Sequence, residues 1–166
     1  GIEIGEHEVV QIPTFVLEDP TRVLAPKPAA FTGGGGYRLT AVAQTSMGDM
    51  GPQSIVLRRG LTGTALDAGE WLVPPTDVSI TRLGASFTPS AGARAHTVQW
   101  RDSTGEDVLE MLILDGSTDI EIPALVTLPS SGISRGSVPA IGADFDLGDF
   151  SPADDRELLW GIAGQP

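Results

Sequence analysis

The chain has 166 residues, 40% of them hydrophobic and 5% aromatic, and 22 acidic against 10 basic side chains give it a formal net charge of −12. So acidic a protein repels nucleic acids and anionic membrane surfaces, because proteins bind polyanions by replacing counterions with cationic side chains. There is no Cys, which excludes disulfides, thiolate metal sites and cysteine nucleophiles. We therefore expect an acidic globular protein with no nucleic acid partner.

Glycine and proline number 21 and 13 residues and are scattered without a period, which is typical of many short strands joined by turns. Lys27 is the only lysine and Asn is absent, a bias typical of a high-GC bacterial genome. No uncharged run reaches the length of a membrane span. Because the chain starts at Gly1 and not at Met, we expect a processed or excised piece, which a removed signal peptide or lipoprotein leader would fit.

The N-terminal part, residues 1–74, alternates strand signals with turn residues. Predicted strands cover Glu8–Ile12, Thr14–Glu18, Tyr37–Ala43 and Gln53–Arg59. The tetraglycine that ends at Gly36 lacks the Lys and the spacing of a phosphate-binding loop, so it predicts a plain loop. We expect 1–74 to form either a small β-module or extra strands of the domain that follows. The boundary is predicted at Pro74 and Pro75, because a Pro-Pro pair makes a stiff extended joint.

The C-terminal part, residues 75–166, has the strand count and spacing of an immunoglobulin-like β-sandwich. The seven predicted strands are Asp77–Arg82, Ala85–Thr88, His96–Arg101, Val108–Leu114, Thr118–Ile122, a segment around Ser137–Asp146, and Arg156–Ile162. Two of these places leave a helical alternative open. Val108–Leu114 fits a short helix, and Ser151 with Pro152 is a good helix start that competes with the final strand.

The Asp115-Gly116 pair is the clearest turn signal in the chain. It lies between two runs rich in apolar and β-branched residues, and Asp-Gly favours a two-residue type I′ turn with φ > 0 at both positions. We therefore predict that the strands on either side of this pair form a β-hairpin.

Four segments of the C-terminal part carry a family resemblance. The segments start at Pro74, Ala85, Thr97 and Thr118 and read PPTDVSI, ASFTP, TVQWR and TDIEIPAL. Together they resemble the first five strands of a fibronectin type III-like domain, over roughly residues 75–129. The resemblance implies an all-β, immunoglobulin/fibronectin III-like antiparallel β-sandwich, with the strands of 1–74 as additions. Phe87 stands where that family usually has a Trp.

Catalytic and metal-binding motifs are incomplete. Gly132 to Gly136 matches the G-x-S-x-G nucleophile elbow around Ser134, but that chemistry needs a His later in the chain, and both His7 and His96 precede it. Two histidines without Cys do not supply the three protein ligands of a catalytic zinc, and we interpret His96 as a surface or edge residue. We predict no catalytic residue, no metal ligand and no cofactor.

The densest acidic cluster is a candidate for calcium binding. Its members are Asp144, Asp146, Asp149, Asp154 and Asp155. Calcium needs six to eight oxygen ligands, and the order of an EF-hand is broken because Gly148 precedes the third Asp. Alternation with Phe145 and Leu147 favours a strand with its acids toward solvent, so calcium remains the alternative.

The three tryptophans, Trp71, Trp100 and Trp160, are candidates for the core or for stacking on sugar rings. Trp100 lies in the middle of a predicted strand and is expected in the core. We expect a non-catalytic structural or interaction module of a secreted or cell-envelope bacterial protein, with an unidentified protein or glycan partner. A carbohydrate- or calcium-binding β-sandwich module is the alternative.

Overall fold

The computed structural model describes residues 2–3, 9–10, 15–16, 23–24, 36–44, 52–62, 67–128, 132–133, 135–144 and 147. The chain divides into two compact units. The first comprises Gly1–Leu39, Arg58–Asp67 and Ser151–Pro166, and the second comprises Thr40–Leu57 and Ala68–Phe150. The predicted separation into 1–74 and 75–166 stays a prediction.

The described residues form β-strands, as composition and periodicity predicted. The strands are β1 (Ile2–Glu3), β2 (Val9–Val10), β3 (Phe15–Val16), β4 (Val23–Leu24), β5 (Tyr37–Gln44), β6 (Gln53–Leu61), β7 (Thr76–Ile80), β8 (Gly84–Thr88), β9 (Ala95–Arg101), β10 (Asp107–Ile113), β11 (Asp119–Glu121), β12 (Arg135–Ser137) and β13 (Ala140–Ala143). Val108–Leu114 is therefore strand and not helix. The last predicted strand, Arg156–Ile162, and the helix start at Ser151 lie outside the described residues.

The first unit contains short antiparallel pairings. Strand β1 pairs with β2 and with β5, and Ile2 lies opposite both Val10 and Tyr37. Strand β3 pairs with β4, with Phe15 opposite Leu24. Strands β5 and β6 continue into the second unit.

The second unit has a larger sheet in which β10, β9, β13, β6 and β5 are neighbours in that order. Strand β9 has β10 on one side and both β12 and β13 on the other. Strands β12 and β13 pair with β9 in the same register, because Ser137 lies opposite Gln99 and Ala140 lies opposite His96. Pro139 interrupts them since it has no N–H to donate, but its carbonyl oxygen still accepts from Thr97 N at 3.2 Å.

The other side of β13 pairs with β6, and this pairing is parallel. Ile141 lies opposite Ile55 and Ala143 opposite Leu57. All residues from Ser54 to Leu57 are buried, and Ser54 Oγ accepts a hydrogen bond from Leu72 N at 3.2 Å. Both faces of β6 are therefore covered at this point, which fits the short apolar run from Ile55 to Leu57.

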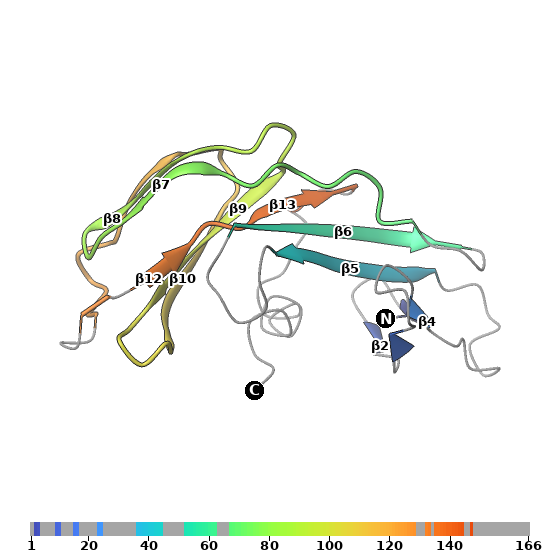
Figure 1. The fold of residues 1–166 in the computed structure, drawn as a ribbon, viewed down its shortest axis with the longest axis horizontal. Coiled ribbons are helices and arrows are strands. Elements are labelled where there is room, and N and C mark those ends of the chain that lie inside the picture. Colours follow the sequence, from blue (N-terminus) through green and yellow to red (C-terminus); the bar gives the residue numbers. More distant parts are fainter. Residues whose placement is uncertain are drawn as a thin grey trace. The chain divides into compact units, whose positions relative to one another are not determined.

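A second sheet in the same unit has the order β11-β8-β7 and packs against the larger one (Figure 1). The core between them is built from Ala85 and Phe87 of β8, Val98 and Trp100 of β9, Ile113 of β10, Ile120 of β11, and Val138. Trp100 Nε1 donates to Thr81 O at 3.1 Å, which ties the larger sheet to the end of β7. The second unit is thus a mostly antiparallel two-sheet β-protein.

The predicted hairpin at Asp115-Gly116 is wrong, although the strands on both sides are right. Strand β10 pairs with β9, whereas β11 pairs with β8 in the opposite sheet. Gly116 has φ 76°, but Asp115 does not share a positive φ, as a type I′ turn would require. Both Ile113 and Ile120 belong to the core between the sheets, so the chain crosses from one sheet to the other here and forms no hairpin.

Candidate functional site

Three hydrogen-bonded polar side chains lie on the face of β9 that points away from the core. Alternation along β9 places Val98 and Trp100 in the core and therefore Gln99 on the other face. Glu110 of β10 and Ser137 of β12 lie opposite Gln99 on its two neighbouring strands, so the three side chains share one face. The register of three strands thus builds this polar row.

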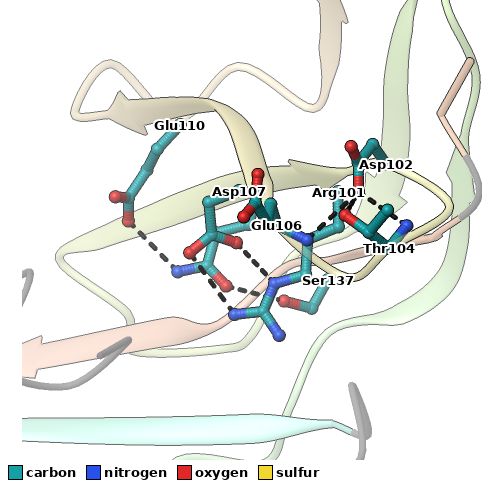
Figure 2. Close-up of polar contacts among 8 residues, drawn as sticks. Arg101, Asp102, Thr104, Glu106, Asp107, Glu110 and Ser137 are labelled. Carbon is teal, nitrogen blue, oxygen red and sulfur yellow. Dashed lines mark hydrogen bonds and ion pairs between the residues drawn. The ribbon is translucent and has the colours of Figure 1, made fainter. Parts of the chain in front are cut away.

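The row is a chain of hydrogen bonds (Figure 2). Ser137 Oγ donates to Gln99 Oε1 at 3.0 Å, and Gln99 Nε2 donates to Glu110 Oε1 at 3.2 Å. Gln99 and Ser137 are buried, which makes these bonds costly to leave unmade. The Ser137 hydroxyl donates to an amide oxygen, which cannot take its proton, so the row positions three strands and does not activate a nucleophile.

Burial raises the pKa of the Glu110 carboxyl, and the hydrogen bond from Gln99 opposes part of this effect. A carboxyl with a raised pKa in the folded state contributes stability at low pH, which is lost as the pH rises through that pKa. We expect Glu110→Gln to keep the Gln99 bond and to raise the free energy of unfolding at pH 7, by less than about 1 kcal/mol. The gain should shrink toward pH 4, and urea unfolding at both pH values measures it. A loss of stability at pH 7 would contradict this reading.

The loop between β9 and β10 is held by two carboxylates (Figure 2). Asp102 Oδ1 accepts from Thr104 Oγ1 at 2.6 Å, from Thr104 N at 2.8 Å and from Glu106 N at 3.2 Å. These bonds, the Thr104 hydroxyl first among them, lower the pKa of Asp102. The Arg101 guanidinium forms an ion pair with Asp107, which lies opposite it where β9 and β10 meet this loop. Each carboxylate serves the turn, which is a structural role.

His96 is buried, and its interpretation as a surface or edge residue is wrong. Alternation did place it correctly on the same face as Val98 and Trp100, but the second sheet covers that face. Its Nε2 accepts a hydrogen bond from Ser90 N at 3.2 Å, and its ring lies 5.0 Å from the Phe87 ring. Burial lowers the pKa of His96. The imidazole is therefore a neutral acceptor in the core.

This burial predicts a pH dependence of stability. Because the folded state disfavours the protonated imidazole, the unfolded chain binds more protons below its pKa of about 6.5, and stability falls as the pH drops through that value. Between pH 6.5 and 5.5 the loss from one group is at most about 1.4 kcal/mol. Urea unfolding of the wild type and of His96→Gln should show that this component disappears in the variant. An unchanged pH dependence in the variant would contradict the assignment.

The remaining candidates from the sequence are not brought together among the described residues. Trp100 is in the core, as predicted, while Trp71 is 47% exposed. Asp144 is exposed after β13. The other residues lie outside the described part: His7, Ser134, Asp146, Asp149, Asp154, Asp155 and Trp160. Within the described part, no group of three His, Asp or Glu side chains is placed to hold a metal ion.

Besides the polar row, sequence reasoning missed a hollow in the surface. This hollow of about 390 Å³ lies between the β7–β8 turn and the segment after β11, with Arg82, Leu83, Ile122, Pro123, Val126 and Leu128 in its wall. The prediction of a strand through Arg82 concealed it, since β7 ends at Ile80. The signal that the sequence offered for the hollow was the apolar Leu83 next to the charged Arg82.

Comparison of the chain with protein-family models, with curated proteins and with solved structures finds no match. Within the described residues, no helix is long and apolar enough to span a membrane.

Proposed function

We propose that the chain is a non-catalytic interaction or structural module of a secreted or cell-envelope bacterial protein, with an immunoglobulin/fibronectin III-like sandwich as its scaffold. The observation that carries the proposal is the distribution of strands between the two sheets of the second unit. The polar row on β9 adds support, since its hydroxyl, amide and carboxyl groups are used to join strands.

The proposed scaffold draws its support from a likeness to the immunoglobulin pattern of strands, compared in chain order. In that pattern the first, second and fifth strands share one sheet, while the third strand and its neighbours form the other. Here β7, β8 and β11 form one sheet, and β10, β9 and the β12–β13 line form part of the other. The position beside β13 is held by β6, from the N-terminal part, in parallel orientation. An immunoglobulin domain has an antiparallel last strand in that position, so the parallel β6, which has β5 on its other side, is a departure from the pattern.

A carbohydrate-binding module is the second candidate, favoured by the half-exposed Trp71. Aromatic rings with a free face stack on sugars, and Trp71 follows the exposed Glu70 in the segment that leads to β7. Calcium binding by the acidic segment that starts at Asp144 belongs to the same alternative.

A glycan array combined with thermal melts in calcium and in chelator tests the proposal. We expect no glycan signal and no shift of the melting midpoint. Trp71→Ala is the matched variant: glycan binding by the wild type that this variant abolishes would replace the proposal with the carbohydrate alternative. A calcium-dependent shift would replace it with the calcium alternative. Detection of the natural protein in cytoplasmic fractions of its bacterium would overturn the envelope assignment.

A further inference from the structure

The hollow beside Arg82 lies between two turns that backbone hydrogen bonds close. At the β7–β8 turn, Thr81 N donates to Gly84 O at 2.8 Å, and Thr81 Oγ1 accepts from both Leu83 N and Gly84 N at 3.2 Å. The carbonyl oxygen of Thr81 is bound to the buried Trp100 ring. Leu83 therefore stands on a turn that the core itself holds in place.

The opposite wall is fixed to the first. Ile122 N donates to Leu83 O at 2.9 Å, which joins the two segments by their backbones, and Val126 N donates to Pro123 O at 2.8 Å to close a second turn. Ile122 also packs against the core cluster. These bonds restrain the backbone of both walls, and a preorganised backbone favours affinity.

The side chains presented here are apolar and exposed. Leu83 is 82% exposed, Leu125 is 98% exposed and Val126 is 36% exposed. Single exposed leucines are ordinary, but Leu83 and Val126 line the same hollow, and exposed apolar side chains that gather in this way favour an interaction site. Leu125 belongs to the second turn but not to the wall of the hollow, so the apolar surface continues beyond it.

Arg82 is the cation of this wall, in a chain whose net charge is −12. Arg82 takes no part in the ion pair between Arg101 and Asp107. Its guanidinium is thus available to a carboxylate, which it can bind through two parallel hydrogen bonds. The wall contains no aromatic ring, which disfavours a sugar, and the acidic charge of the chain disfavours a second copy.

We propose that this hollow docks a polypeptide segment of a partner protein in which a branched or aromatic apolar side chain adjoins a carboxylate. The apolar side chain enters between Leu83 and Val126, the carboxylate meets Arg82, and a second apolar side chain covers Leu125. The inference rests on the interaction role proposed above and names the partner class for it.

Methyl NMR of the full chain tests the inference with defined probes. The probes are two acetylated, amidated peptide pools of sequence Gly-Ser-Φ-Asp-Φ-Ser-Gly and Gly-Ser-Φ-Asn-Φ-Ser-Gly, where Φ is Leu, Ile, Val or Phe. We expect saturable shifts at the methyl groups of Leu83, Leu125 and Val126, with the Asp pool binding about threefold more tightly than the Asn pool. Arg82→Gln should abolish that preference, and Leu83→Ser should weaken both pools about tenfold.

Matched controls lie outside the hollow, just before β9 and just after β10. Arg94→Gln and Leu114→Ser change an exposed Arg and a half-exposed Leu outside the hollow and should leave both affinities unchanged. Absence of saturable shifts at the three methyl groups, equal binding of the two pools, or equal effects of control and test variants would each overturn the inference. The proposed function is contradicted by glycan binding or by a calcium-dependent shift, whereas this inference is contradicted by the peptide titrations alone. The two outcomes are therefore distinguishable.

Discussion

Trp100→Ala is expected to lower the free energy of unfolding by about 4 kcal/mol, a large part of the stability of a small domain. Trp100 is completely buried between the two sheets and belongs to the core cluster with Val98 and Phe87. Its removal leaves a cavity and also frees the Thr81 carbonyl oxygen that accepts from its ring nitrogen. Urea unfolding followed by far-ultraviolet circular dichroism measures the loss without relying on tryptophan fluorescence.

Two further variants distinguish the effect of a cavity in the core from the effect of removing any tryptophan side chain on the free energy of unfolding. Trp71→Ala removes a half-exposed ring and should cost less than about 1 kcal/mol. Trp100→Phe keeps most of the apolar volume but not the hydrogen bond, so its loss should lie between those of the two Ala variants. Equal losses for Trp100→Ala and Trp71→Ala would show that the core is not centred on Trp100.

Gly84→Ala is the second substitution with a large expected effect, about 3 kcal/mol of destabilisation. A Cβ at Gly84 would lie 1.9 Å from the carbonyl oxygen of Ile120, which is backbone and cannot rotate away. The collision forces β8 and β11 apart where Glu121 lies opposite Gly84. It also loosens the β7–β8 turn at the hollow, because the N–H and the carbonyl of Gly84 both serve that turn.

Gly142→Ala is the matched control in a strand. The nearest atom to a Cβ there is Leu72 Cδ1 at 3.4 Å, the end of a flexible side chain, so this variant should change the free energy of unfolding by less than about 1 kcal/mol. Differential scanning calorimetry of both variants gives the comparison. Similar melting midpoints for the two would contradict the close approach of β8 and β11.

The existence of the strands could be predicted from the sequence because apolar alternation and turn residues are local signals. Strands β5, β6 and β7 to β11 begin and end within a few residues of their predicted bounds. Their partners were harder to predict. Asp115-Gly116 favours a hairpin locally. The structure instead buries Ile113 and Ile120 in one core from two different sheets, and the burial of this apolar surface outweighs the local preference of the turn. The parallel pairing of β6 with β13 joins segments more than 80 residues apart, and no local sequence pattern predicts it.

The polar row and the hollow depend on such long-range register. Gln99, Glu110 and Ser137 carry no recognisable motif, and they meet only because β10 and β12 flank β9. His96 appeared as a strand start at the surface because the sequence does not reveal that Ser90 and Phe87 cover it. The hollow needs two loops that are about 40 residues apart, joined by the bond from Ile122 to Leu83. Composition and charge, by contrast, are properties of the whole chain, and the exclusion of a nucleic acid partner that rests on them stays a prediction.

The most direct test of the two-sheet arrangement is a NOESY spectrum of the isotope-labelled chain, read at the backbone of β8, β10 and β11. The arrangement predicts cross-strand contacts between Ile120 and Ala85, together with contacts between Met111 and Val98. It predicts no backbone ladder between β10 and β11. A ladder that joins these two strands across Asp115-Gly116 would restore the hairpin, place Ile120 in the other sheet, and contradict the sandwich on which the proposals rest.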